Sequence, residues 1–194
     1  MRRVYLQMYL TLDGCTDQVS FPGDDDPDGS EHEVWVGRYE EFGTLVLGRR
    51  AYEDWAKAWN TSIRRKSDPI FFHQHSRFVE SVPKIVFSRT LKKALLPNTT
   101  IERRDPVKVI SELKRQKGKD ISVGGGPTLA RTLMDADLID EYLLTILPVV
   151  LGKGPRLFVG DRKSQLNLKL IKSTIERSGV MMLHYRSAKS PDPT

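Results

Sequence analysis

The chain has 194 residues, of which 39% are hydrophobic and 29% are charged, and these values are typical of one ordinary globular domain. No uninterrupted apolar stretch approaches the roughly 20 residues that a membrane-spanning helix needs. The single cysteine, Cys15, excludes an intramolecular disulfide and a cysteine-based zinc cluster. The first residues lack the pattern of a signal peptide, so we expect a cytoplasmic protein.

The net charge of +6 is unevenly distributed along the chain. Residues 13–54 contain 12 acidic and 3 basic side chains, whereas residues 55–194 contain 13 acidic and 26 basic ones. A basic excess attracts polyanions, which include nucleic acids and phosphorylated cofactors. The lysines and arginines are scattered, with no aromatic stripe between them, so we do not expect nucleic acid as a partner.

The first half of the chain is expected to hold two strands and two helices. Apolar and β-branched runs predict the strands, and apolar residues three and four apart predict the helices. A capping box formed by Ser30 and Glu33 marks the start of the first helix. The predicted order is a strand at 4–12, a loop at 13–30, a helix from Ser30 through Phe42 that Gly43 ends, a strand at 44–47 and a helix at 49–56. Residues 57–82 follow without a clear pattern.

The second half alternates strands with helices and closes with a hairpin. The predicted order is a strand at 84–87, a helix at 106–116, a strand at 121–123, a helix at 127–134, a strand at 139–147 and hairpin strands at 166–175 and 180–186. Such alternation predicts an α/β fold, with a mixed, mainly parallel sheet flanked by helices and an antiparallel C-terminal hairpin. We expect one domain at 1–187 and a disordered tail at 188–194.

Ligands of open α/β sheets bind beyond the carboxyl ends of the strands, so the residues that follow each strand are candidates for a site. The sharpest feature is the run Gly124-Gly125-Gly126. Glycine lets a ligand approach the backbone closely, and the next helix offers free N–H groups. This arrangement suits a pyrophosphate, and a tight turn without a ligand is the alternative. The spacing matches neither GxGxxG nor a Walker loop.

Basic and hydroxyl side chains follow two other strands. Arg49 and Arg50 come after the second strand, and Ser88, Arg89 and Thr90 come after the third. Guanidinium groups bind phosphate through forked hydrogen bonds, although any one arginine alone is more typical of a solvated surface. Two such groups beside a glycine turn indicate a ligand that carries phosphate.

Other candidate side chains have plain structural alternatives. The carboxylates that could orient a polar ring or assist proton transfer are Asp13, Glu31, Glu33 and Glu53, and Asp13 could equally be a turn residue. Trp35 could line a pocket for a flat heterocycle or belong to the core. His73 and His75 would share one face of a strand, but two ligands without a third make a weak metal site.

Five stretches, in order over nearly the whole chain, resemble the dihydrofolate reductase-like superfamily. The closest resemblance is to the C-terminal reductase domain of the bifunctional deaminase-reductase of riboflavin biosynthesis. The matching stretches are 11–14 (TLDG), 47–53 (LGRRAYE), 86–91 (VFSRTL), 124–129 (GGGPTL) and 147–158 (LPVVLGKGPRLF). This resemblance implies a mixed sheet of about eight strands, an NADPH-dependent reduction and commonly a homodimer.

The resemblance also implies roles for individual residues. The pyrophosphate would be held by Gly124, Gly125, Gly126, Pro127, Thr128 and Leu129. Gly48, Arg49 and Arg50 would reach the phosphates, and Ser88, Arg89 and Thr90 would face the adenosine 2′-phosphate. Asp13 would be the catalytic residue beside the nicotinamide, and Glu33 and Trp35 would border the substrate. Two departures from the pattern are Ala51, where a threonine often bonds the pyrophosphate, and the lack of a zinc-deaminase motif.

The sequence therefore predicts an NADPH-dependent reductase of a small pterin- or pyrimidine-like heterocycle. Its substrate would be bounded by Asp13, the 15–30 loop and the first helix. Folate reduction itself is unsupported, because the position of a folate-binding carboxylate among residues 31–33 is uncertain. The alternative is a protein that keeps the fold and the nucleotide crevice but binds its ligand without catalysis.

Overall fold

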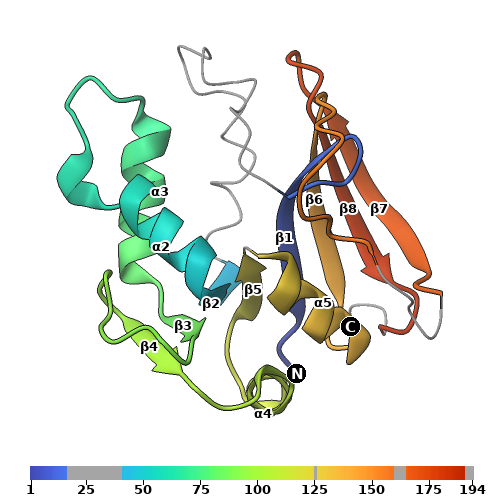
Figure 1. Cartoon of the computed structure of the whole chain (residues 1–194), viewed down its shortest axis with the longest axis horizontal. Helices are drawn as coiled ribbons and strands as arrows, with labels where there is room; N and C mark the ends of the chain where they lie inside the picture. Colours follow the sequence, from blue (N-terminus) through green and yellow to red (C-terminus); the bar gives the residue numbers. More distant parts are fainter. Residues whose placement is uncertain (17–40, 125, 160–164, 191–194) are drawn as a thin grey trace.

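The computed structural model describes residues 1–16, 41–124, 126–159 and 165–190. One sheet within these residues has eight strands in the order β4-β3-β2-β5-β1-β6-β8-β7 (Figure 1). The strands are β1 Val4–Thr11, β2 Phe42–Gly48, β3 Lys84–Phe87, β4 Thr99–Glu102, β5 Asp120–Gly124, β6 Glu141–Leu147, β7 Leu168–Ile175 and β8 Met181–Ser187. All pairings from β4 to β6 are parallel, and β8 is antiparallel to both neighbours. The predicted fold class is confirmed.

Helices lie on both faces of the sheet. They are α2 Arg49–Ala58, α3 Ile70–Ser81, α4 Pro106–Arg115 and α5 Pro127–Asp135, with a 3₁₀ turn η3 at Thr61–Ile63. Consecutive strand residues point to opposite faces, so on β2 Val46 belongs to the cluster with α4 and α5, and Leu47 to the cluster with α2 and α3. None of the helices in the described parts of the chain is long and apolar enough to cross a membrane.

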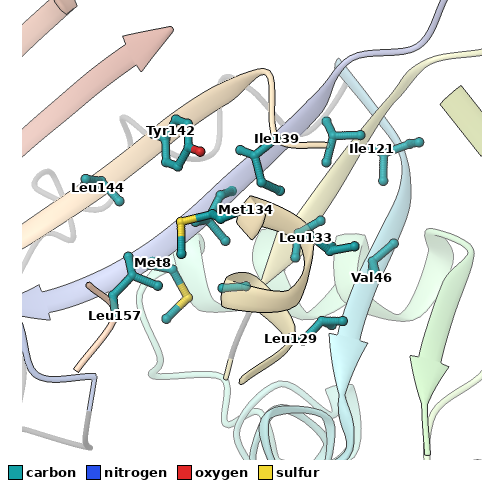
Figure 2. Close-up of a cluster of buried hydrophobic side chains, with 14 of the residues drawn as sticks. Met8, Val46, Ile121, Leu129, Leu133, Met134, Ile139, Tyr142, Leu144 and Leu157 are labelled. Atoms are coloured by element: carbon teal, nitrogen blue, oxygen red, sulfur yellow. The ribbon is translucent and has the colours of Figure 1, made fainter. Parts of the chain in front are cut away.

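The larger hydrophobic core lies between α4, α5 and the middle of the sheet (Figure 2). Every second residue of β1 points into it, from Val4 to Leu10. From α5, Leu133 is fully buried there and stabilises the fold by about 2 kcal/mol. The packing of α5 against β1, β2 and β5 fixes where this helix begins, immediately beyond the end of β5.

The opposite face of β1 and β6 carries polar side chains. Glu141, at the start of β6, is only 1% exposed. Its carboxylate accepts hydrogen bonds from Arg3 and from Nε of Arg186, the latter at 3.2 Å, and it is paired with Nε2 of His184. Burial by itself would raise the pKa of Glu141, but His184 and Arg186 outweigh that effect and lower it to about 2. This buried carboxylate therefore holds β1, β6 and β8 together as an anion.

Some boundaries differ from the sequence prediction. Phe42 and Gly43 belong to β2 and do not end a helix, because the Phe42 ring packs edge-on against Tyr5, with ring centroids 5.4 Å apart. The rest of that predicted helix, with Glu33 and Trp35, lies outside the described residues. The short edge strand β4 was not predicted. Residues 57–82, which gave no pattern, contain η3 and α3.

One smaller expectation, the strand placement of two histidines, also changes. His73 and His75 lie on α3, so they do not share a strand face, and the His75 ring packs 4.1 Å from that of Trp59 between centroids. The disordered tail at 188–194 stays a prediction, and its first residues, 188–190, lie within the described part of the chain. The Ala188 amide donates to Asn167 O at 2.9 Å, and the Ser190 hydroxyl donates to Asp140 at 3.0 Å.

Replacing Glu141 should make the free energy of unfolding less dependent on pH in the acidic range. The ionised carboxylate stabilises the folded state fully above its ordinary pKa of 4.5, and this contribution is lost as pH falls toward 2. Glu141→Gln leaves two guanidinium groups without their counter-ion, so we expect the free energy of unfolding at pH 7 to fall by about 2–4 kcal/mol. Urea unfolding at pH 7 and about pH 3 should show the difference from wild type shrinking in acid.

The matched control is Asp137→Asn, which breaks an exposed ion pair with Lys189. Its cost should stay below about 0.5 kcal/mol, because surface ion pairs contribute little. A difference between Glu141→Gln and wild type that is equally large at both pH values would contradict the role assigned to the carboxylate.

Candidate functional site

The candidate residues meet at one edge of the sheet. Since all pairings from β4 to β6 are parallel, the carboxyl ends of these strands lie along the same edge of the sheet. This edge carries the segments after β1, β2, β3 and β5 that the sequence singled out, namely Asp13, Gly48–Arg50, Ser88–Thr90 and 126–129 with Gly124. Gly125, Glu33 and Trp35 lie outside the described residues.

Two helices begin at this edge from glycine, without a side-chain cap. Gly48 is the N-cap of α2 and Gly126 is the N-cap of α5, and neither first turn contains an acidic residue. The helix starts are neighbours, because Leu47 of β2 pairs with Gly124 of β5. By contrast α4 is capped by Asp105. Among the described residues, the first N–H groups of α2, and those that follow Pro127 in α5, are therefore left for another partner, and helix N-termini favour anions.

The glycines leave room beside the backbone. Gly126 has a φ of +87°, which favours glycine, and a Cβ atom there would meet nothing within 4 Å. Gly124 has no positive φ that would require glycine. A Cβ atom at 124 would lie 3.4 Å from Leu47 Cδ2 and 3.5 Å from Trp55 Cζ2, which are ordinary contacts. The fold would therefore accept alanine at 124, so the fold alone does not explain the glycine.

Arginines occupy the first turn of α2, where the helix dipole disfavours positive charge. Arg49 forms an ion pair with Glu53 at 2.8 Å and donates to Thr90 Oγ1 at 2.7 Å. The second bond connects the ends of β2 and β3. The exposed Arg50 side chain makes no hydrogen bond to other described residues. A bound anion at the two helix starts would offset this unfavourable placement of charge.

The loop after β3 is shaped by Ser88. Its hydroxyl accepts hydrogen bonds from the amides of Thr90 at 3.2 Å and Leu91 at 2.9 Å, so Ser88 first of all forms the turn. Arg89 is exposed at the tip of this turn. The Ser88 amide donates to the Glu102 carbonyl at 3.0 Å, which brings the end of β4 alongside.

Arg103, which follows β4, is a candidate that sequence reasoning missed. Its neighbour Arg104 is held by Glu102, at 2.8 Å, and by Glu112. The bonds from Arg104 also lower the pKa of Glu102 to about 2. The Arg103 side chain is exposed and has no such partner among the described residues. Recognising β4 in the sequence would have revealed it, because Arg103 directly follows its strand, as Ser88 directly follows β3.

Asp13 is fully engaged by its surroundings. Thr11 donates to Oδ1 at 2.6 Å, and Oδ2 accepts from the Gly152 amide at 2.9 Å and from Arg156 at 3.4 Å. The Thr11 hydroxyl above all, then the amides of Leu151 and Gly152 and the Arg156 guanidinium, hold the pKa of Asp13 well below its ordinary value. An anion so bound is a poor proton donor at neutral pH, which favours a positioning role over the catalytic role that the sequence predicts.

Backbone hydrogen bonds extend this connection between the ends of β1 and β6. The Leu12 amide donates to Val149 O at 2.8 Å, and Thr16 donates to Pro155 O at 2.7 Å. We call residues 11–16 and 149–156, with their hydrogen bonds, the clasp. Asp13 lies at its centre. The clasp fixes one end of the candidate site.

A second missed candidate is Thr145, on the polar face of β6. It is 1% exposed, and its buried hydroxyl has no hydrogen-bond partner in the structure as described. The register of β1 pairs Tyr9 with Thr145 and Gln7 with Gly124, so the hydroxyl lies two strands from the glycine turn. Leaving such a group unpaired costs about 1–3 kcal/mol. A threonine in a strand gives no signal of this in the sequence.

Together the strand order, the C-terminal hairpin and the site at the carboxyl edge define a dihydrofolate reductase-like α/β domain. The family model named RibD C-terminal domain matches residues 2–182. The chain belongs to that family. In Bacillus subtilis (strain 168), the uncharacterised protein YyaP is 32% identical over 188 residues, which cover 95% of this chain and 94% of that protein.

Solved structures show the same fold. A protein of Shewanella sp. PV-4, assigned provisionally to riboflavin biosynthesis, has a TM-score of 0.68 and 22% identity, with 97% of this chain and 100% of that chain covered. The diaminohydroxyphosphoribosylaminopyrimidine deaminase/5-amino-6-(5-phosphoribosylamino)uracil reductase of Thermotoga maritima has a TM-score of 0.63 and 14% identity. The match covers 96% of this chain and 57% of that longer one.

Removing the Asp13 charge should loosen the clasp. One neutral carboxamide oxygen cannot replace the charged acceptors, so Asp13→Asn should raise the amide hydrogen-exchange rates of Leu151 and Gly152 by about tenfold. Exchange followed by NMR or mass spectrometry measures this. The exposed substitution Asp137→Asn should leave both rates unchanged. Wild-type rates in Asp13→Asn would show that other bonds hold the loop.

Proposed function

We propose that this protein is an NADPH-dependent reductase of a small pyrimidine- or pterin-like heterocycle. The observation that carries the proposal is the pair of adjacent, uncapped helix starts at Gly48 and Gly126, beside exposed arginines. Membership of the RibD C-terminal domain family supports it. The similar structure from Thermotoga maritima is that of a 5-amino-6-(5-phosphoribosylamino)uracil reductase, which supports a pyrimidine as the substrate class.

The residues present fit a dinucleotide that carries three phosphates. The open backbone at Gly126 and the first turn of α2 suit a diphosphate, which would approach main-chain N–H groups. Arg89 and Arg103, both exposed at the ends of neighbouring strands, suit the 2′-phosphate. Bound NADPH would supply the hydride. The task of the chain is to hold it against the substrate and to exclude water.

The polar face of β1 and β6 is proposed as the floor of the substrate site. Thr145 offers a buried hydroxyl without a partner, and Gln7 offers an amide whose Oε1 accepts from Ser122 at 2.9 Å. Heterocyclic rings with polar edges satisfy such groups. Asp13 would hold the clasp at the end of this floor. Glu33 and Trp35 remain sequence predictions for its border, as do the homodimer and the cytoplasmic location.

Gly124→Ala tests the nucleotide site without disturbing the fold. Since an added methyl group would make only ordinary contacts, we expect the melting temperature to change by less than about 2 °C. NADPH should stabilise the wild type by about 2.7 kcal/mol at 100 times its dissociation constant, but bind the variant at least about 30-fold more weakly. Thermal unfolding and calorimetric titration with NADPH measure both effects.

Gly43→Ala is the opposite control, because it lies at the other edge of the sheet. Its methyl group would come 2.9 Å from Lys119 Cβ, so we expect a loss of about 1–3 kcal/mol in stability but unchanged NADPH affinity. If the wild type does not bind NADPH, the proposal fails. Tight binding without NADPH oxidation over a panel of pyrimidines and pterins would favour the non-catalytic binding protein.

Thr145→Val should increase the stability of the fold and lower the catalytic efficiency. Valine has the same shape without the unpaired hydroxyl, so we expect the free energy of unfolding to rise by about 1 kcal/mol. With 5-amino-6-(5-phosphoribosylamino)uracil as the first substrate to test, kcat/KM should fall about tenfold, while NADPH affinity is unchanged. Steady-state NADPH oxidation and urea unfolding measure the two effects. A loss of stability together with wild-type kinetics would contradict the role given to Thr145.

A further inference from the structure

Tyr52, in the second turn of α2, is completely buried and its phenol is fully hydrogen-bonded. The oxygen accepts from the amides of Leu95 and Leu96, both at 2.8 Å, and the hydroxyl donates to Thr99 Oγ1 at 3.1 Å. One donor and two acceptor positions are all that a tyrosine hydroxyl has. The helix therefore holds the backbone of a separate loop through one atom.

That loop, residues 88–98, joins β3 to β4 and contains neither helix nor strand. It carries three exposed basic side chains, Arg89, Lys92 and Lys93. None of the three has a hydrogen bond or an ion pair within the described parts of the chain. Leu91 and Leu96 anchor the loop from below, in the same buried cluster as the Tyr52 ring.

The same helix begins at the nucleotide site, because Arg49 and Arg50 precede Tyr52 by less than one turn. Arg49 also reaches the loop directly through its bond to Thr90. Two sets of hydrogen bonds thus connect α2 to the cationic loop. Arg49 contacts the loop near Arg89, and Tyr52 contacts it at Leu95 and Leu96. No other described side chain hydrogen-bonds the amides of Leu95 and Leu96.

We infer that Tyr52 is a positioning residue that fixes the cationic loop relative to the start of α2, so that one dinucleotide can place its diphosphate and its 2′-phosphate together. This inference rests on the proposed function. The α2 start meets groups that NADPH and NADH share, whereas the loop meets only the 2′-phosphate. Loosening the loop therefore weakens NADPH binding more than NADH binding. The contact with the 2′-phosphate adds affinity only when the loop is held in the right position relative to the start of α2.

The test is Tyr52→Phe, which keeps the ring and removes the hydroxyl. We expect the dissociation constant of NADPH, measured by calorimetric titration, to rise about tenfold, and that of NADH to change less than about threefold. Tyr142→Phe is the matched control. Tyr142 is equally buried, at 1% exposure, but lies in the other core cluster, so its variant should bind both cofactors as the wild type does.

A second measurement needs no variant. In the wild type, NADPH should slow hydrogen exchange at the Leu95 and Leu96 amides more than NADH does at equal saturation. Equal weakening of both cofactors in Tyr52→Phe, unchanged affinity for both, or equal exchange with both cofactors overturns the inference. Failure of the wild type to bind either dinucleotide overturns the proposed function itself, and Tyr52 would then be a structural anchor of the loop.

Discussion

The candidate site depends on backbone N–H groups at two adjacent helix starts, which no described side chain caps. A side-chain cap stabilises a helix by about 1 kcal/mol, and Asp105 provides one for α4. Gly48 and Gly126 provide none for α2 and α5, and Arg49 and Arg50 add charge that the α2 dipole disfavours. The chain thus forgoes stability at one place, where the carboxyl ends of β2 and β5 meet. A bound anion is the partner that would recover it.

The strand order places two different kinds of side chain on either side of this point. In the order β4-β3-β2-β5-β1-β6, the glycine turn after β5 lies between the β2–β4 half, with its exposed arginines, and the β1–β6 half, with the clasp and Thr145. Charge gathers in the first half, and buried polar groups gather in the second. An extended ligand with a phosphate-rich end and a flat polar end would match this division.

Much of the fold follows from local sequence, but parts of the site do not. The apolar run of β1 and the capping pair Asp105-Pro106 determine their own structures, so sequence reasoning found them. Phe42 was misread because a buried aromatic at helical spacing can equally serve a strand. The four-residue, mostly half-buried β4 has no alternating pattern to detect, and Arg103 was missed with it. The phenol of Tyr52 finds partners more than 40 residues away, which only the tertiary structure brings together.

Two polar residues on the same face of β6 show how structure and function can be separated. Glu141, at the amino end, is buried and meets Arg3, Arg186 and His184, so its desolvation is compensated within the chain. Thr145 lies on the same face, closer to the carboxyl edge of the sheet. It is equally buried, but its hydroxyl has no hydrogen-bond partner in the described structure. Natural folds rarely leave such groups without a partner. The unpaired hydroxyl lies toward the same edge of the sheet as the glycine turn and the clasp. Its position therefore favours a hydrogen bond to a bound ligand.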